Sequence, residues 1–396
     1  MGIRTEKGYY DLIIIGGGAA GLTAAISYGR AGGRDALILE SEGFVGRKLP
    51  ATGNGRCNLS NLLAPGYENT KAFFESLGIL LTRDEAGRIY PLGRQASVVR
   101  DVLEEAARDS GAGIIVDCRA VGISTDPLSV TTKDGDVIRT GKLIVAAGGK
   151  SGPQYGSKGD GFAFARKFGH NVLSILPALA PLTYAEGVAA KFSSLKGVRA
   201  IGGLKLLTSE GEVIAGSEGG IQFTDFGVSG ICAFDLSGAL AKRKRQDPGV
   251  EFELRIDFAP SMSIDVLSSY LERESLAGLR GIMHAKIASL LESEIKSTGK
   301  SDGAFNDPCK KAAIVKGFPV IISGTRGWKE SQVTSGGVEL SEINLETMES
   351  KLFPGLYFAG EVLDYDGPSG GWNLDWAWNS GLIAGRSAAI NVSGDA

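Results

Sequence analysis

The chain has 396 residues, of which 43% are hydrophobic and 22% are charged, and its formal net charge is −3. A chain of this length can bury a large core, and two or three globular domains are expected. Because acidic and basic residues are interspersed, the sequence offers no electrostatic footprint for nucleic acid or for an anionic membrane surface. We expect neither as a partner, and we interpret the basic run at residues 242–245 as a solvated helix end.

The sequence also argues against a membrane span, a secretion signal and a metal centre. No apolar stretch reaches the roughly 18 to 20 residues that a bilayer requires, and the first residues lack the charged-then-apolar order of a signal peptide. A cytoplasmic location is therefore expected. The four cysteines form no CxxC pair and are expected to be reduced thiols. The two histidines, His170 and His284, are expected at the surface or at helix ends, and no metal site is expected.

The first forty residues predict a strand, a tight turn, a helix and a second strand. Residues 11–15 are a short β-branched run, three consecutive glycines follow, and residues 19–30 are typical of a small-residue helix. A second apolar run at 36–39 completes a βαβ unit.

The turn carries the pattern Gly-x-Gly-x-x-Gly, which becomes specific when it lies between a strand and a helix. Its first glycine permits the turn, its second lets the backbone approach a pyrophosphate, and its third lets the helix pack on the strand. The helix start adds free N–H groups and positive potential. Glu40 closes the second strand about 20 residues further on, where a carboxylate accepts hydrogen bonds from ribose hydroxyls. The turn therefore predicts dinucleotide contacts at Gly16, Gly18, Ala19, Ala20 and Gly21.

The α/β pattern continues through the first 150 residues. A helix is expected at 97–110. The sequence around Asp134 and Gly135 favours a hairpin turn. Strands are expected before, within and after this hairpin, at residues 113–116, 120–124, 130–132, 137–139 and 142–147.

From about residue 182 the pattern changes to short, closely spaced strands. They indicate an inserted antiparallel barrel or sandwich, with strands at 203–208, 212–215 and 251–257. Helical periodicity follows at 263–274, with Ser263 as the N-cap, and at 279–297.

After about residue 325 the α/β character returns, with a buried strand at 355–359 and a final helix at 374–390. The final helix carries small residues at three- and four-residue steps, which are expected to let it approach the sheet closely: Ala377, Gly381, Ala384 and Ala388.

Several segments resemble one bacterial flavoprotein family. Gly46-Arg47-Lys48 and the stretch ATGNGRCNLSN at 51–61 are close to its signature GRKxxxSGNGRCNxTN. Further segments that resemble family stretches lie at 146–149, 223–230, 333–338, 358–361 and 370–373. The family includes aminoacetone oxidases and the BaiN-type reductases of bile-acid metabolism.

The resemblance implies an α/β fold in which a split Rossmann-like FAD-binding domain contains an inserted β-barrel and a small helical subdomain. The implied bounds are 1–182 and 326–396 for the FAD-binding domain, 183–260 for the barrel and 261–325 for the helical subdomain. FAD is the implied cofactor and is held non-covalently. Beyond the first turn and Glu40, the implied cofactor contacts are Arg47, Lys48, Gly53, Asn54, Gly55, Val121, Ala147, Gly148, Gly360, Glu361, Gly371, Asn373 and Leu374.

Glu361 follows a predicted strand at the place where related flavoproteins use an acidic residue on the ribityl chain, and Asp364 and Asp366 are competing candidates. The final helix is expected to begin near Gly371 and Asn373. Its dipole would then favour the negative charge that develops on the flavin upon reduction.

Four positions depart from the family pattern. Asp225 and Ile231 stand where members usually carry His and Pro, and Trp372 and Asp375 stand where members tend to carry Tyr and Gln. These departures leave the substrate class open. Cys57 lacks a basic histidine partner, and we interpret it as a loop-packing residue and not as a nucleophile. The tryptophans are interpreted as packing residues as well.

The favoured function is hydride transfer between a small organic substrate and FAD, with catalytic side chains unassigned. The sequence shows a single dinucleotide fingerprint, so NAD(P)H is expected only as a transient donor and not in a domain of its own. Two alternatives stay open: an amine oxidase that releases hydrogen peroxide, and a flavin-holding sensor or binding module.

Overall fold

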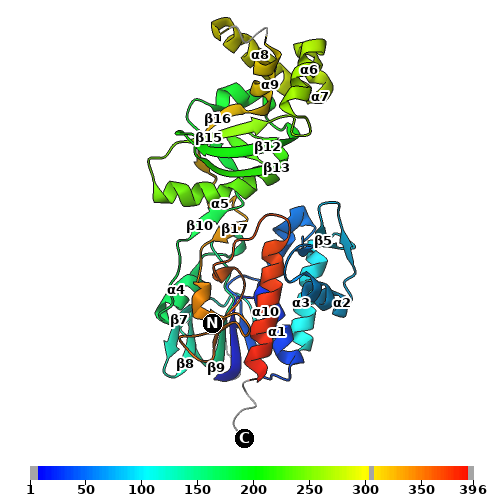
Figure 1. The fold of residues 1–396 in the computed structure, drawn as a ribbon. Helices are drawn as coiled ribbons and strands as arrows, with labels where there is room; N and C mark the ends of the chain where they lie inside the picture. Colours follow the sequence, from blue (N-terminus) through cyan, green and yellow to red (C-terminus); the bar gives the residue numbers. More distant parts are fainter. Residues whose placement is uncertain (1–7, 303–306, 391–396) are drawn as a thin grey trace. The chain divides into compact units, whose positions relative to one another are not determined.

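The computed structural model describes residues 8–302 and 307–390 (Figure 1). The chain divides into two compact units: unit 1 consists of residues 1–175 and 333–396, and unit 2 consists of residues 176–332. Each unit has its own buried hydrophobic core. The insertion therefore begins at 176 and ends at 332, where the sequence favoured 183 and 325.

Unit 1 is built on a nine-stranded sheet with a parallel centre. Strand β1 (Tyr9–Ile15) pairs in parallel with β2 (Ala36–Leu39) on one side and with β9 (Val137–Val145) on the other. β2 pairs in parallel with β6 (Gly113–Ile115), and β9 with β20 (Leu356–Phe358). Every residue of β2 and β20 is buried, as expected for strands covered on both faces. The remaining strands of this sheet pair in antiparallel fashion: β7 (Ala120–Thr125), β8 (Leu128–Thr132), β18 (Ile343–Asn344) and β19 (Glu349–Ser350).

The predicted hairpin around Asp134 and Gly135 is confirmed, since Val130 of β8 lies opposite Ile138 of β9. The prediction of two separate strands at 137–139 and 142–147 is wrong, because β9 is continuous from Val137 to Val145. Its first half pairs with both β8 and β1, so the polar residues there do not interrupt it.

Helix α1 (Ala19–Arg30) and the final helix α10 (Trp372–Ile390) lie side by side in unit 1 (Figure 1). A Cβ at Gly381 would lie 2.4 Å from Ala20 O, and one at Gly385 would lie 2.0 Å from Ala24 O. Gly381 of the predicted stripe and Gly385 therefore pack on α1. The helix also contacts β20 and β9 of the sheet, as expected. α10 also begins two residues before the predicted start.

The described part of unit 1 contains three further α-helices and several short elements. The predicted helix at 97–110 is α3 (Ala96–Asp109). A separate three-stranded sheet has the order β3-β5-β4. Bounds of the remaining elements are η1 (Leu49–Gly55), β3 (Ser60–Asn61), α2 (Tyr67–Ser76), β4 (Leu81–Arg83), β5 (Arg88–Pro91), η2 (Pro153–Tyr155), α4 (Asp160–Lys167), β17 (Val333–Ser335), η6 (Leu340–Glu342) and η7 (Gly360–Val362).

His170 lies just beyond α4 and is buried, with 3% of its surface exposed. Its Nδ1 lies 2.9 Å from Glu342 Oε2 and its Nε2 lies 2.8 Å from Ser350 Oγ. Of the two expected positions, the helix end is confirmed, since His170 N donates to Ala165 O of α4, and the surface is wrong. The histidine is buried because its two partners satisfy both ring nitrogens.

Unit 2 is built on a closed six-stranded barrel with the order β11-β14-β13-β12-β15-β16. An antiparallel barrel was one of the two architectures that the strand spacing favoured. The barrel interior is aromatic: Tyr184 stacks on Phe192 with ring centroids 5.0 Å apart, and Phe258 packs edge-on against Phe318 at 6.0 Å. Strand bounds are β10 (Leu176–Ala178), β11 (Leu182–Tyr184), β12 (Arg199–Thr208), β13 (Val213–Phe223), β14 (Gly227–Ser229), β15 (Phe252–Asp257) and β16 (Phe318–Thr325).

The helices of unit 2 are η3 (Ala189–Leu195), α5 (Ile231–Gln246), α6 (Ile264–Glu274), η4 (Leu276–Gly278), α7 (Leu279–Ile282), α8 (Ala285–Asp302) and α9 (Pro308–Lys316). Ser263 caps α6 as predicted, since its Oγ accepts a hydrogen bond from Val266 N at 3.3 Å. The predicted single helix at 279–297 is wrong: Met283 is extended, and His284 Nδ1 accepts the N–H of Lys286 at the start of α8. The apolar spacing hides this break because Leu279 and Ile287 face the same core.

Candidate functional site

The glycine turn after β1 has three different steric requirements. Gly16 has a φ of +102°, and a Cβ there would lie 2.5 Å from Ala146 O. A Cβ at Gly21 would lie 1.9 Å from Gly16 O, so only glycine lets α1 approach the turn. At Gly18 a Cβ would meet no atom within 4 Å. The packing of the chain therefore does not explain why position 18 is a glycine. The open space beside it suits the close approach of a ligand.

Gly18 precedes α1, whose first turn includes Ala19 and Ala20 and has no side-chain cap. The first N–H groups of a helix have no partner within it, so they are free to bind an anion. The structure thus brings the predicted turn contacts together at one helix start.

Glu40 lies directly after β2 and its carboxylate is fixed by the backbone. Oε2 accepts the N–H of Gly17 at 2.9 Å, and Oε1 accepts the N–H of Glu42 at 2.9 Å. Oε1 also accepts from Ser41 Oγ at 3.2 Å. A carboxylate has about four acceptor positions, so the remaining capacity for a ribose hydroxyl lies on Oε2. Glu40 is half-buried and lies beside the turn, where the sequence predicted it.

The signature loop adopts a left-handed backbone in η1. Gly53 and Asn54 both have a φ of 56°, and Gly55 has a φ of 82°. Cys57 N donates to Thr52 O at 3.1 Å, which closes the loop. The Cys57 side chain is buried, and burial raises the pKa of its thiol to about 12, so it packs the loop and is not a thiolate nucleophile.

Lys48 and Glu361 bring the signature loop to the C-terminal segment. Lys48 Nζ donates to Glu361 Oε2 at 3.1 Å, and Thr334 N donates to Glu361 Oε1 at 2.7 Å. Gly149 N donates to Glu361 Oε2 at 3.3 Å. One carboxylate therefore joins the loop after β9, the strand β17 and the signature loop. Thr334 is a member of this cluster that the sequence did not single out, although it lies in a family-like segment.

Four more of the predicted cofactor contacts belong to segments near the Glu361 cluster and the glycine turn: Arg47, Ala147, Gly148 and Gly360. Arg47 Nη1 donates to Glu42 Oε2 at 2.5 Å, which places it beside the Glu40 loop. Ala147 and Gly148 follow β9, and a Cβ at Gly16 would lie 3.0 Å from the Cα of Ala147. A Cβ at Gly360 would lie 2.9 Å from the Cβ of Ala20, so this glycine contacts the first turn of α1.

Val121 is less closely connected to the others. It lies on β7 at a register shift, and 52% of it is exposed. Cys118, three residues earlier, donates its N–H to Glu40 O at 2.8 Å. Val121 therefore lies three residues beyond Cys118, the residue that contacts Glu40, and its side chain is exposed.

The start of α10 is held by the signature loop and by its own side chains. A Cβ at Gly371 would lie 2.3 Å from Ser60 O. Asn373 accepts the N–H of Gly367 at 2.9 Å and donates to Gly367 O at 2.9 Å, so its side chain holds the preceding loop. Leu374 is half-buried in this first turn.

Asp375 is buried and was noticed in the sequence only as a departure from the family pattern. Its Oδ1 accepts from Ser60 Oγ and Thr70 Oγ1 at 2.7 Å each, and its Oδ2 accepts the N–H of Gly66 at 3.0 Å. Burial raises its pKa and outweighs these hydrogen bonds, which lower it. Asp375 therefore joins α10, β3 and α2.

The tryptophans of α10 donate to backbone carbonyls. Trp376 Nε1 donates to Gly360 O at 3.2 Å, and its ring stacks on Tyr365 at 4.6 Å. Trp378 is fully buried and its Nε1 donates to Leu59 O at 2.9 Å. These two side chains pack the C-terminal segment.

Three buried polar atoms of unit 1, Asn58 Oδ1, Asp136 Oδ2 and Ser335 Oγ, have no hydrogen-bond partner within residues 8–302 and 307–390. Two of them, Asn58 Oδ1 and Ser335 Oγ, lie in the family-like segments. Buried polar groups are normally satisfied, so these two atoms are available to a ligand or to an ordered water molecule. Together with the open space at Gly18 and the fixed carboxylate of Glu40, they fit a bound dinucleotide.

The departures at Asp225 and Ile231 lie in unit 2. Asp225 is exposed and forms an ion pair with Lys196 at 2.8 Å, which lowers the pKa of its carboxyl. Ile231 is the first residue of α5. In the described part of the chain no group of three or more His, Cys, Asp and Glu side chains is arranged to hold a metal ion. None of the described helices is long and apolar enough to cross a membrane.

Similarity to known proteins covers nearly the whole chain. Residues 66–387 match the HI0933-like protein Rossmann domain. A 3-dehydro-bile acid delta(4,6)-reductase of Clostridium scindens is 35% identical, and the match covers 95% of this chain and 98% of that protein. A ribosomal RNA dihydrouridine synthase of Escherichia coli is 28% identical, over 96% of this chain and 99% of that protein.

Among solved structures, a 3-ketosteroid delta1-dehydrogenase of Sterolibacterium denitrificans has the same fold, with a TM-score of 0.54 at 13% identity. That match covers 97% of this chain and 100% of the other. The predicted fold class and cofactor are confirmed. The chain belongs to the HI0933-like family and is an FAD-dependent oxidoreductase.

Proposed function

We propose that the enzyme uses FAD held by unit 1 to add hydrogen to a carbon–carbon double bond that is conjugated with a carbonyl group in a small organic substrate. The observation that carries this proposal is the pair of near-full-length relatives. One is named as a delta(4,6)-reductase and the other as a dihydrouridine synthase, and both names describe the addition of hydrogen to an unsaturated ring.

Hydride addition to such a bond creates negative charge on the substrate. A conjugated carbonyl places that charge on oxygen, where hydrogen-bond donors can stabilise it. FAD supplies the hydride chemistry when it is bound. The protein binds and orients the two reactants and excludes water.

In this proposal the sequence-predicted residues contact different parts of the cofactor. The N–H groups at the start of α1 bind the pyrophosphate beside Gly18, and Glu40 accepts from the adenosine ribose. Glu361, held by Lys48, faces the ribityl chain. The start of α10 at Gly371 and Leu374 borders the flavin ring, with Asn373 fixing the loop that precedes it.

NADH or NADPH is the proposed electron donor. The chain has a single glycine fingerprint, and that turn serves FAD. The nicotinamide nucleotide therefore binds transiently and departs before the substrate is reduced.

A uridine within RNA is the second candidate substrate. It is favoured by the names of the relatives from Escherichia coli and Haemophilus influenzae, which are 28% and 26% identical. We prefer the small substrate because the relative named for a bile acid is more similar, at 35% identity.

The test is anaerobic reduction of the FAD-loaded protein by NADH or NADPH, followed by addition of a 3-keto-4-ene steroid or a uridine-containing RNA. In a separate arm, a primary amine is added to the FAD-loaded protein in its oxidised form. We expect the steroid to reoxidise the flavin with formation of the saturated ketone. Reoxidation by the RNA alone would assign the second substrate. Reduction of oxidised FAD by the amine, with hydrogen peroxide released in air, would contradict the proposal in favour of an amine oxidase. No turnover with any of them would favour the sensor alternative. The Gly18→Ala variant is the background control.

A further inference from the structure

Tyr365 lies in the loop between η7 and α10, and its ring is held by α10. The ring stacks on that of Trp376, with centroids 4.6 Å apart and an interplanar angle of 15°. The indole Nε1 of Trp376 donates in turn to Gly360 O at 3.2 Å. Gly360 contacts the first turn of α1, since a Cβ there would lie 2.9 Å from the Cβ of Ala20. A chain of direct contacts therefore connects the phenol ring to the helix start at which the cofactor is proposed to bind.

The hydroxyl of Tyr365, unlike its ring, has no partner in the described part of the protein. Within residues 8–302 and 307–390 the hydroxyl forms no hydrogen bond, and its oxygen is accessible from outside the protein. A Cβ at Gly367 would lie 3.1 Å from this oxygen and 2.8 Å from the Cβ of Trp372. The glycine therefore leaves one side of the hydroxyl uncovered, beside the first residue of α10.

The surroundings of the hydroxyl keep its proton in place. Burial raises the pKa of Tyr365, and the carboxyl groups of Asp375 and Asp366 raise it further. A phenol that stays neutral at physiological pH is a hydrogen-bond donor. Hydrogen bonds to an ionised acceptor are shorter and stronger than those between neutral groups. The best partner for this donor is therefore an oxygen atom that gains negative charge.

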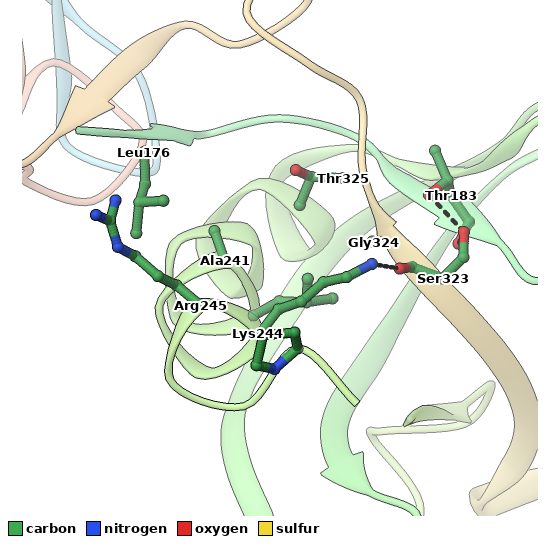
Figure 2. A pocket seen from close by; sticks show the side chains of 10 residues that line it. Leu176, Thr183, Ala241, Lys244, Arg245, Ser323, Gly324 and Thr325 are labelled. Atoms are coloured by element: carbon green, nitrogen blue, oxygen red, sulfur yellow. Dashed lines mark hydrogen bonds between the residues drawn. The ribbon is translucent and has the colours of Figure 1, made fainter. Parts of the chain in front are cut away.

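The pocket of about 610 Å³ in unit 2 differs in how its polar groups are arranged (Figure 2). Lys244 donates to Ser323 O, and Ser323 Oγ lies 3.0 Å from Thr183 Oγ1. Figure 2 shows Arg245 directed the other way, toward Leu176. Because these groups bind one another or point apart, they do not form a common donor site for one substrate oxygen.

We propose that Tyr365 is a catalytic residue whose hydroxyl donates a hydrogen bond to the carbonyl oxygen of the substrate. This inference rests on the proposed function, in which an enone is reduced beside the start of α10. A hydride supplied by reduced FAD adds to the β-carbon, and the negative charge moves through the α-carbon to the carbonyl oxygen. Tyr365 stabilises this enolate and keeps its own proton. A proton from water then binds the α-carbon and gives the saturated ketone.

The experiment compares wild type, Tyr365→Phe and Tyr9→Phe, all as the full chain with FAD bound. Tyr365→Phe keeps the ring that stacks on Trp376 and removes only the hydroxyl. Tyr9→Phe is the matched control, because Tyr9 lies in the same unit and is 52% exposed. It is the first residue of β1, whereas the glycine turn follows the last residue of that strand. The FAD dissociation constant and the denaturation midpoint establish that each variant folds and holds its cofactor.

Stopped-flow absorbance measures the two halves of the reaction separately. Flavin reduction by NADH or NADPH does not involve the substrate carbonyl, so its rate constant should stay within about twofold in Tyr365→Phe. Reoxidation by a 3-keto-4-ene steroid should be about 10²- to 10³-fold slower, as when one donor to an oxyanion is removed. The saturated ketone, titrated calorimetrically into the oxidised protein, should bind about two- to tenfold more weakly. Tyr9→Phe should match wild type within about twofold in all three measurements.

Equal reoxidation rates in Tyr365→Phe and wild type would overturn the assignment while leaving the reductase proposal intact. A loss of FAD affinity and of flavin reduction without a change in ketone binding would also overturn it, because the hydroxyl would then contact the cofactor. If a uridine-containing RNA reoxidises the flavin and the steroid does not, the same comparison is made with the RNA, since uracil also has a double bond conjugated with a carbonyl.

Failure of the reductase proposal gives a different result. Wild type would then reduce neither the steroid nor the RNA. Binding of the saturated ketone that weakens in Tyr365→Phe and not in Tyr9→Phe would still support the contact between the hydroxyl and a carbonyl oxygen. Ketone binding that is absent from wild type, or equal in all three proteins, would overturn that contact as well.

Discussion

Lys48 Nζ and Glu361 Oε2 lie 3.1 Å apart although 313 residues separate them in the sequence. Both side chains are largely buried, with 30% and 19% of their surfaces exposed. Glu361 also accepts backbone N–H groups from Thr334 and Gly149, so it holds three segments of unit 1 in position.

Glu361→Gln should weaken FAD binding by about 1 to 3 kcal/mol, because one carboxylate oxygen becomes an N–H₂ group that faces Lys48 and the N–H of Gly149. The measurement is the dissociation constant of FAD by fluorescence titration. Glu330→Gln is the matched control, since Glu330 pairs with Arg326 in unit 2. Equal FAD affinity in both variants would remove Glu361 from the cofactor site.

Gly18→Ala should lower the affinity for FAD, whereas Gly21→Ala should lower the stability of the fold. Gly18 has an ordinary φ of −80° and free space around its Cβ position, so the alanine variant should fold normally and lose FAD affinity. Gly21→Ala forces a backbone overlap at 1.9 Å and should cost more than about 3 kcal/mol of folding free energy. Denaturant unfolding of the flavin-free proteins separates the two effects. Normal FAD binding by Gly18→Ala would show that the pyrophosphate does not approach this position.

Glu40→Ala should affect both folding and FAD binding. The carboxylate accepts the N–H groups of Gly17 and Glu42, and loss of each buried acceptor costs about 1 to 3 kcal/mol. Glu40→Gln keeps an acceptor for one of these groups and should fold better than the alanine variant while still binding FAD weakly. The measurements are the unfolding free energy without flavin and the FAD dissociation constant. An unchanged dissociation constant in Glu40→Gln would contradict the ribose assignment.

Asp375 predicts a specific pH dependence of stability. Burial raises its pKa above the ordinary value of 3.8, so the folded state binds this proton more tightly than the unfolded state. Its contribution is fully present below pH 3.8 and is lost as the pH rises through the folded pKa. The stability of the wild type relative to Asp375→Asn should therefore fall as the pH rises.

The control for this experiment is Asp225→Asn, where the sign is opposite. Lys196 lowers the pKa of Asp225, so its contribution is present above pH 3.8 and is lost as the pH falls through the folded pKa. Denaturant unfolding over a pH series measures both. A stability difference for Asp375→Asn that stays constant with pH would show that burial does not hold the proton there.

Cys309 should be the one cysteine that alkylates rapidly in the native protein. It is exposed, whereas Cys57, Cys118 and Cys232 are buried. Burial raises the pKa of Cys57 to about 12 and those of the other two buried thiols to about 11, so their thiolate fractions at neutral pH are very small. Mass spectrometry after iodoacetamide treatment should find one modified residue, and Cys309→Ser should abolish it. Rapid labelling of Cys57 would reopen its interpretation as a nucleophile.

The sequence predicted best those features that are local along the chain. The turn from Gly16 to Gly21 and the position of Glu40 depend on steric and hydrogen-bonding rules that act within forty residues. Single members of distant contacts were also predicted, as with Lys48 and Glu361. Their pairing was not, because no local pattern indicates which side chains meet across 313 residues.

The failures have the same physical origin. His170 has no local sign of burial, since its partners Glu342 and Ser350 follow about 170 to 180 residues later. The interruption of the helix at Met283 is hidden because both halves present apolar residues to one core. The stripe of α10 predicted the approach to the sheet but not the packing on α1, because small residues indicate close approach without identifying every partner.

The division of unit 1 into two chain segments determines the order in which a ribosome can complete the protein. β20 pairs with β9, and α10 packs on α1, yet all of unit 2 is synthesised between these partners. The nascent chain therefore finishes unit 2 while the edge of β9 and one face of α1 are still uncovered. Exposed strand edges and apolar faces of this kind are the surfaces that chaperones protect. The cofactor domain begins before unit 2 but can become complete only after it.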